Sequence, residues 1–351
     1  MQQTMKQNLE PSNSLIPLIS VSKLYKRFNL EAGFFARLGR YINAVNGVSF
    51  RIGRNESYGL VGESGCGKTT TARLLVRMYE ADSGDILFHR EDGSAQQVQT
   101  LQWHDLKRYR QQVKYVFQDP ARSLNPRMTV YEVLTSGAKW SMQNEEEEEE
   151  QRQTAALKEE VKSILEEVGL SARDMERRPA EFSGGQRQRI SIARGLLMQP
   201  ELLICDEVVS ALDVSIQGQI LNLLLDLRSN RKSLGKSLSF LFIAHDLKVA
   251  CYFCDRIGVM YRGELMEEAP AQEIWKHALH PYTELLFSSA IGKVQPERQT
   301  HLDKLTSAQS ENACAFAARC AYTEKRCLEE KPELLPVEKN HLVRCWRNHG
   351  N

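Results

Sequence analysis

Apolar residues recur along the chain in short runs that alternate with stretches of helical periodicity. Apolar runs of strand length lie at 58–61, 112–118, 201–207 and 237–246. Helical spacing of apolar residues lies at 70–78, over most of 129–197 and at 216–228. Strands that alternate with helices predict an α/β fold whose sheet is parallel in part.

Shorter stretches of strand character mark two further parts of the chain. Between residues 16 and 58 they alternate with turns, and the sequence of 44–62 predicts a hairpin followed by a buried strand. The sequence of 256–269 predicts a second pair of strands. Residues 1–15 are polar and are expected to be flexible. The acidic run at 144–150 favours a solvated helix start or loop over a binding tail.

Composition excludes several classes of protein. The chain has 351 residues, 42% of them hydrophobic, enough for a large core and for two or three domains. The net charge of +1 gives no overall footprint for nucleic acid. The N-terminus does not resemble a signal peptide, and no run of about 18 apolar residues predicts a membrane-spanning helix. We therefore expect the chain in the cytosol, where thiols are normally reduced.

The sequence GESGCGKT at 62–69 fits the pattern of a phosphate-binding loop. It lies between an apolar strand and a helix, the context that this loop requires, which disfavours the alternative of a glycine-rich turn with a chance Lys-Thr pair. Lys68 is expected to reach the β- and γ-phosphates of a nucleotide, and the Thr69 hydroxyl to hold Mg²⁺. The predicted nucleotide-binding residues here are Gly62, Glu63, Ser64, Gly65, Cys66, Gly67, Lys68, Thr69 and Thr70.

An acidic pair ends a second apolar strand. Asp206 and Glu207 close the run 201–207, and α/β sheets bind their ligands at the carboxyl ends of strands. Asp206 can complete the coordination of Mg²⁺, and Glu207 can polarise an attacking water as general base. Taken alone, the pair fits a cap of the following helix equally well, but the upstream phosphate loop favours the catalytic interpretation.

Several ordered motifs resemble those of the ABC ATPases. The sequence EFSGGQRQRISIARGLL at 181–197 resembles their signature, with Phe182 where leucine is usual. VFQDP resembles their Q-loop, SALD their D-loop and IAHD their switch strand, in the family's order. The resemblance covers about residues 16–290. It implies an α/β fold of the P-loop type, with a RecA-like core, an antiparallel β subdomain and a helical subdomain at about 119–199.

The resemblance also implies roles for residues outside the phosphate loop. Gln118 would join the Mg²⁺ site to the helical subdomain, and His245 would contact the γ-phosphate and orient the attacking water. Gln118, His245 and Glu207 are thus the expected catalytic residues. Thr69, Gln118 and Asp206 are the expected Mg²⁺ ligands.

A second anion site is expected where the signature helix begins. Ser183 supplies a hydroxyl there, and two glycines supply free N–H groups. In this family two cassettes pack head to tail, so a chain with one cassette must pair with a second ABC ATPase, identical or homologous. The further residues expected to contact ATP are Ser183, Gly184, Gly185, Gln186 and Asp213, with Phe28 on the adenine and Tyr25 as its rival.

Two C-terminal features resemble one branch of this family. His280, Pro281 and Tyr282 open an extension, and a cysteine-rich segment follows. Together with VGESGCGKTT and FQDPARSLNPRMTV, they resemble the ATPase subunits of bacterial oligopeptide, dipeptide and nickel importers. The resemblance implies an ATP-hydrolysing subunit that powers peptide import. Its partners would be two membrane permeases, a second ATPase and, indirectly, a substrate-binding protein.

The resemblance further implies a peripheral position on the cytoplasmic face of the inner membrane. It divides the chain into a cassette at 16–270 and an extension at 271–351. The alternative is an ABC ATPase without permeases that acts on nucleic acid or ribosomes. Such proteins commonly hold two cassettes or long basic or coiled-coil insertions, which this sequence lacks, so no nucleic-acid partner is expected.

Four of the eight cysteines lie in the extension: Cys314, Cys320, Cys327 and Cys345. Four thiolates suit tetrahedral zinc or an iron–sulfur cluster. The spacing of the cysteines alone does not choose between zinc, a cluster and four cysteines without a ligand. The resemblance favours a [4Fe-4S] cluster, with zinc as the alternative, that folds the extension far from the ATP chemistry. Cys66 is expected to be a variable position of the phosphate loop. Cys205, Cys251 and Cys254 are expected to be core residues.

Overall fold

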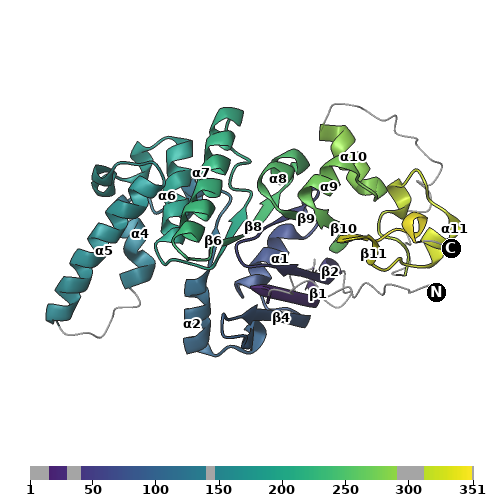
Figure 1. Ribbon diagram of the computed structural model, residues 1–351, viewed down its shortest axis with the longest axis horizontal. Helices are drawn as coiled ribbons and strands as arrows, with labels where there is room; N and C mark the ends of the chain where they lie inside the picture. Colours follow the sequence, from purple (N-terminus) through teal and green to yellow (C-terminus); the bar gives the residue numbers. More distant parts are fainter. Residues whose placement is uncertain (1–15, 30–40, 140–146, 291–311, 350–351) are drawn as a thin grey trace, which may run out of the picture.

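The computed structural model describes residues 16–29, 41–139, 147–290 and 312–349 (Figure 1). The segment 1–15, which was expected to be flexible, and residues 144–146 of the acidic run lie outside these ranges. The rest of the acidic run begins a helix, α5 (Glu147–Glu167). Within the described ranges, every helix is too short or too polar to cross a bilayer.

The main sheet has eight strands. In spatial order they are β11 (Leu335–Glu338), β12 (His341–Val343), β10 (Glu264–Pro270), β9 (Arg256–Tyr261), β3 (Ser57–Val61), β8 (Ser239–Ala244), β7 (Leu202–Asp206) and β6 (Val113–Val116). The five from β9 to β6 are parallel, whereas β10, β12 and β11 add to one edge in antiparallel pairs. Every residue of β3, β7 and β8 is buried, as the continuous apolar runs predicted.

A second, antiparallel sheet has the order β2 (Tyr41–Ile52), β1 (Ile19–Asn29), β4 (Ser83–His89) and β5 (Ala95–Gln97). The hairpin predicted within 44–62 is wrong, because residues 44–52 belong to one strand that pairs with β1. Gly47, with φ of +73°, is an extra residue at a shift of register and therefore marks a bulge. The strand pair predicted at 256–269 is confirmed as β9 and β10.

Helices follow the strands in the alternation that the sequence predicted. They are α1 (Lys68–Leu75), α2 (Trp103–Gln112), α3 (Pro120–Ser123), α4 (Val130–Lys139), α5, α6 (Gly184–Leu196), α7 (Val214–Ser233), α8 (Leu247–Phe253), α9 (Ala271–Lys276), α10 (Pro281–Ala290) and α11 (Lys325–Glu329). Figure 1 shows α4, α5 and α6 at one end of the molecule and the C-terminal segment, in yellow, at the other.

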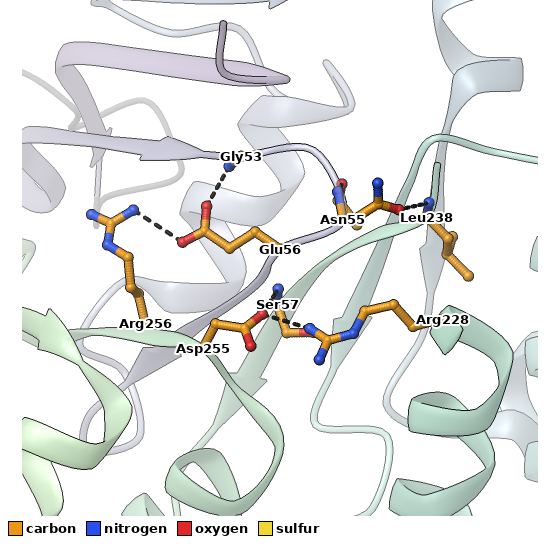
Figure 2. A network of polar contacts seen from close by, with 9 residues as sticks. Gly53, Asn55, Glu56, Ser57, Arg228, Leu238, Asp255 and Arg256 are labelled. Carbon is orange, nitrogen blue, oxygen red and sulfur yellow. Dashed lines mark hydrogen bonds and ion pairs between the residues drawn. The ribbon is translucent and has the colours of Figure 1, made fainter. Parts of the chain in front are cut away.

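A polar network fixes the beginning of β3, the strand that leads into the phosphate loop (Figure 2). The Asp255 carboxylate accepts hydrogen bonds from the Ser57 N–H at 2.8 Å and from Arg228 of α7 at 2.5 Å. Arg256, at the start of β9, forms an ion pair with Glu56 at 3.1 Å. These contacts join β3 to its neighbours at the end of the strand opposite the loop.

One buried carboxylate of the main sheet binds two separate parts of the C-terminal extension. Glu267 of β10 is completely buried, and its backbone pairs with Val343 of β12. Its side chain accepts hydrogen bonds from the N–H groups of Leu279 at 2.7 Å and His280 at 3.1 Å. The imidazole of His341 contacts the same carboxylate at 2.7 Å. Both the beginning and the end of the extension therefore converge on Glu267.

The His-Pro-Tyr sequence is a helix start with a buried aromatic ring. The Nδ1 atom of His280 accepts a hydrogen bond from the Tyr282 N–H at 3.0 Å and so caps α10, which has Pro281 at its first position. Burial lowers the pKa of His280 to about 4, so its ring is neutral at pH 7. The Tyr282 ring packs against Tyr261 and Phe316, with centroids 4.6 and 5.3 Å away.

Candidate nucleotide-binding site

The phosphate loop connects β3 to α1 and contains positions whose backbone conformation only glycine adopts without strain. Gly65 and Gly67 have φ of +79° and +110°. A Cβ atom at Gly67 would lie 2.0 Å from the carbonyl oxygen of Ala44, so a larger residue would displace the loop. The helix α1 begins directly afterwards, at Lys68, and its N-terminus favours an anion.

Lys68 lies inside the loop. Its side chain is buried, and Nζ donates hydrogen bonds to the carbonyl oxygens of Gly62 at 2.7 Å and Glu63 at 2.9 Å. Cys66 is buried beside it, and burial raises the pKa of its thiol. Nζ also lies 3.7 Å from the Cys66 sulfur. The ammonium group is therefore held in the loop by backbone carbonyls and this sulfur, where it can serve a phosphate group.

The predicted Mg²⁺ ligands Thr69 and Asp206 meet at the carboxyl end of β7. The Thr69 hydroxyl donates to Oδ1 of Asp206 at 3.0 Å. Tyr115 of β6 donates to Oδ2 of the same carboxylate at 2.5 Å, and burial, followed by the charge of Asp206, raises the pKa of this phenol. Hydroxyl and carboxylate oxygens are the ligands that Mg²⁺ prefers, so this pair fits the ion. Sequence reasoning missed Tyr115, which belongs to no motif.

The three expected catalytic residues also come together, from the ends of three adjacent strands. Gln118 donates through Nε2 to the Glu207 carboxylate at 2.7 Å. Nδ1 of His245 lies 3.9 Å from the same oxygen of Glu207. Glu207 has φ of +48°, an uncommon conformation for a residue with a side chain and one that recurs at functional sites. Because the Gln118 side chain is hydrogen-bonded to Glu207, the role of Gln118 as a Mg²⁺ ligand stays a prediction.

The signature residues lie away from the phosphate loop of their own chain. Ser183 accepts a hydrogen bond from the Gln186 N–H at 3.3 Å, and the Gln186 side chain accepts one from the Ser183 N–H at 3.0 Å. These two bonds form a capping box. Ser183 and Gln186 are exposed at the start of α6, and Gly184 and Gly185 are half-buried. Asp213 is exposed just before α7. Figure 1 shows α6 and α1 in separate parts of the molecule.

The contacts of Phe28 and Tyr25 do not decide which of these two rings would stack on adenine. Phe28 is half-buried and meets Tyr79 edge to face, with centroids 5.4 Å apart. The Tyr25 side chain is 39% exposed and its hydroxyl packs against Gly47. Phe28 therefore stays a prediction, with Tyr25 as its rival.

The four C-terminal cysteines line one cavity of about 340 Å³, together with His280, Phe316 and Trp346. Burial raises the pKa of Cys314 to about 11, so a thiolate there would need a bound cation. Within the described residues, no three His, Cys, Asp or Glu side chains are placed to hold a metal ion, which supports neither zinc nor an iron–sulfur cluster.

The cysteines at 205, 251 and 254 behave as core residues. Cys205 and Cys254 are buried, and Cys254 packs against Gly59 of β3. Burial raises the pKa of Cys251 to about 12, so this thiol is not reactive at pH 7.

The expectation that the extension lies far from the ATP chemistry is wrong. Arg319, next to Cys320, forms a two-pronged ion pair with Glu63 of the phosphate loop, at 2.8 and 2.9 Å. The hydroxyl of Tyr282 accepts a hydrogen bond from the Glu63 N–H at 3.0 Å. The two partners of Glu63 lie more than 200 positions further along the sequence, so no local pattern announces these contacts.

These features together define the class of the protein, which is an ABC ATPase. They are the phosphate loop, the pair Thr69 and Asp206, the group around Glu207 and the separate signature helix. The ABC transporter family matches residues 45–210, and the C-terminal region of the oligopeptide/dipeptide transporters matches residues 266–327.

Whole-chain relatives specify the branch. The chain is 40% identical to the oligopeptide transport ATP-binding protein AppF of Bacillus subtilis (strain 168), over 93% of this chain and 96% of that protein. It is 38% identical to the oligopeptide transport ATP-binding protein OppF of Haemophilus influenzae, over 96% of this chain and 98% of that protein. The chain belongs to the family of oligopeptide transport ATP-binding proteins.

Solved structures of ABC cassettes confirm the fold class. CbiO1 from Clostridium perfringens, part of the ABC transporter complex cbiONQ, superposes with a TM-score of 0.59 at 25% identity, over 74% of this chain and 91% of that one. The dimeric cassette MJ0796 bound to ADP and Pi superposes with a TM-score of 0.56 at 25% identity, over 72% of this chain and 98% of that one.

Proposed function

We propose that this chain hydrolyses ATP to power the import of peptides into a bacterial cell. The observation that carries the proposal is that one chain joins a region of the ABC transporter family, at 45–210, to the C-terminal region of the oligopeptide/dipeptide transporters, at 266–327. Its partners are two membrane permeases, a second ABC ATPase and, indirectly, a substrate-binding protein. The chain sits peripherally on the cytoplasmic face of the inner membrane. Action on nucleic acid or ribosomes is not favoured, because the relatives are transport proteins.

ATP binds with its phosphates in the loop 62–69. Lys68 and the backbone N–H groups of the loop hold the β- and γ-phosphates, and the N-terminus of α1 adds a favourable dipole. The oxygens of Thr69 and Asp206 hold Mg²⁺, which neutralises phosphate charge when it is bound. Tyr115 fixes the orientation of the Asp206 carboxylate through its hydrogen bond.

Hydrolysis depends on the residues grouped around Glu207. Its carboxylate takes a proton from the attacking water, while Gln118 holds that carboxylate in place and His245 contacts the γ-phosphate. The signature residues 183–186 and Asp213 serve the ATP of the partner ATPase, because they lie away from their own chain's loop. Two ATP molecules are therefore enclosed between two cassettes, and their closure moves the permeases.

The variant Glu207→Gln tests this assignment in the transporter assembled with its permeases in lipid vesicles. We expect ATP binding to be retained and phosphate release to fall by about a hundredfold or more, because the general base is lost. Uptake of a labelled oligopeptide should fall in parallel, whereas Glu166→Gln on exposed α5 should change neither. Wild-type hydrolysis in Glu207→Gln would refute the assignment, and hydrolysis without peptide uptake in the wild type would refute peptide import.

We further propose that the cavity lined by Cys314, Cys320, Cys327 and Cys345 holds a [4Fe-4S] cluster within the extension 271–351. The support is that the four cysteines line one cavity in a chain expected to stay in a reducing compartment. Protein purified without oxygen should contain iron and acid-labile sulfide. Cys327→Ser should lose both, whereas Cys251→Ser should keep both. Colourless wild-type protein without iron would refute the cluster.

A further inference from the structure

Glu63 is the second residue of the phosphate loop, and the C-terminal extension binds both its side chain and its backbone. Arg319 donates from both terminal nitrogens to the two carboxylate oxygens, at 2.8 and 2.9 Å. The Tyr282 hydroxyl accepts the N–H at 3.0 Å. A loop that must adopt one conformation to bind phosphate is thus bound from outside by two side chains.

The extension presents these two side chains rigidly. Tyr282 is buried, and its ring packs against Tyr261 and Phe316. The Arg319 guanidinium lies 5.7 and 5.8 Å from the centroids of the same two rings. Because Arg has a planar fork that matches a carboxylate, this contact fixes the direction of the Glu63 side chain as well as its distance.

The charge of Glu63 explains why its direction matters. Its backbone oxygen binds the Lys68 ammonium at 2.9 Å, so this residue borders the place where phosphates are expected. A free carboxylate at that border would repel the triphosphate. Paired with Arg319, the carboxylate is turned toward the extension and its charge is offset.

We propose that Arg319 and Tyr282 are positioning residues for ATP, acting through Glu63. Arg319 holds the carboxylate away from the phosphates, and Tyr282 fixes the backbone of the loop beneath them. Arg319 directly precedes Cys320, so the cysteine-lined cavity and the phosphate loop are linked by one residue. The inference rests on the proposal that ATP binds at residues 62–69.

The experiment compares Arg319→Gln with Arg326→Gln in the assembled transporter. Arg326 also lies in the extension and pairs with a carboxylate, that of Glu330 at 3.1 Å, but its partner is not in the loop. We expect Arg319→Gln to raise the KM for ATP about fivefold or more with kcat changed by less than about twofold, because only binding is affected. Arg319→Lys should restore part of the affinity, and Arg326→Gln should match the wild type.

A double-mutant cycle shows whether Arg319 acts through Glu63. In the Glu63→Gln background, Arg319→Gln should have no further effect on KM, because the charge that Arg319 offsets is gone. Tyr282→Phe, which removes only the hydroxyl, should raise KM about threefold and provides the test if Arg319→Gln fails to fold. An unchanged KM in both Arg319→Gln and Tyr282→Phe would overturn the inference. A wild type that fails to bind ATP would instead refute the proposed function.

Discussion

Glu267 offers the sharpest test of how the extension is held to the sheet. Its buried carboxylate is the shared acceptor for the N–H groups of Leu279 and His280 and for the His341 imidazole. Glu267→Ala leaves three donors without an acceptor, those of His280 and His341 buried and that of Leu279 half-buried. Each such donor costs about 1–3 kcal/mol, so after partial relaxation we expect the free energy of unfolding to fall by about 4 kcal/mol. That is a large share of the stability of a typical domain.

The measurement is urea-induced unfolding followed by circular dichroism, with limited proteolysis to locate the change. Glu267→Gln keeps the shape but turns an amide donor toward one of the three donors, so a loss of about 2 kcal/mol is expected. Glu273→Ala, on the exposed face of α9, should stay within about 0.5 kcal/mol of the wild type. If Glu267→Ala unfolds at the wild-type urea concentration, the carboxylate does not anchor the extension.

Two other changes test single residues. Gly67→Ala places a Cβ against the Ala44 carbonyl at a φ of +110°, a conformation that costs an L-residue about 1–2 kcal/mol, so ATP affinity measured by calorimetry should fall at least about tenfold. Wild-type affinity would contradict this reading of the loop. Because burial lowers the pKa of His280 to about 4, the unfolded chain binds this proton more readily, and stability is lost as pH falls from about 6.5 toward 4. His280→Asn keeps an acceptor for the Tyr282 N–H but does not titrate. It should therefore remove about 2 kcal/mol of the fall in the free energy of unfolding between pH 7 and pH 5. An unchanged pH dependence of urea unfolding would contradict the assignment.

The fold class and the central site could be predicted because their signals are local. The phosphate loop needs its glycines, lysine and threonine in one short segment between a strand and a helix. Asp206 and Glu207 close one apolar run, Gln118 follows another, and His245 ends a third. The carboxyl ends of parallel strands meet at one edge of a sheet, so these residues had to come together.

Other features of the fold and the site could not be predicted, because they depend on contacts between residues that are distant in the sequence. The asparagine–glycine pair at Asn46 and Gly47 is a common hairpin signal, yet pairing with β1 made it a bulge within one strand. Tyr115 occupies an ordinary strand position, and its role follows only from the neighbouring Asp206. The pairing of Glu63 with Arg319 joins residues 256 positions apart, which no periodicity or spacing encodes.

The pairing of β12 with β10 has a practical consequence for anyone shortening this chain. Without β12, the hydrogen-bonding groups along β10 would form an open sheet edge, which is a template for association between molecules. A cassette cut after residue 290 would also expose the buried glutamates of β10 that the last forty residues cover. Such a fragment is expected to aggregate on expression, so studies of the isolated ATPase need the whole C-terminus.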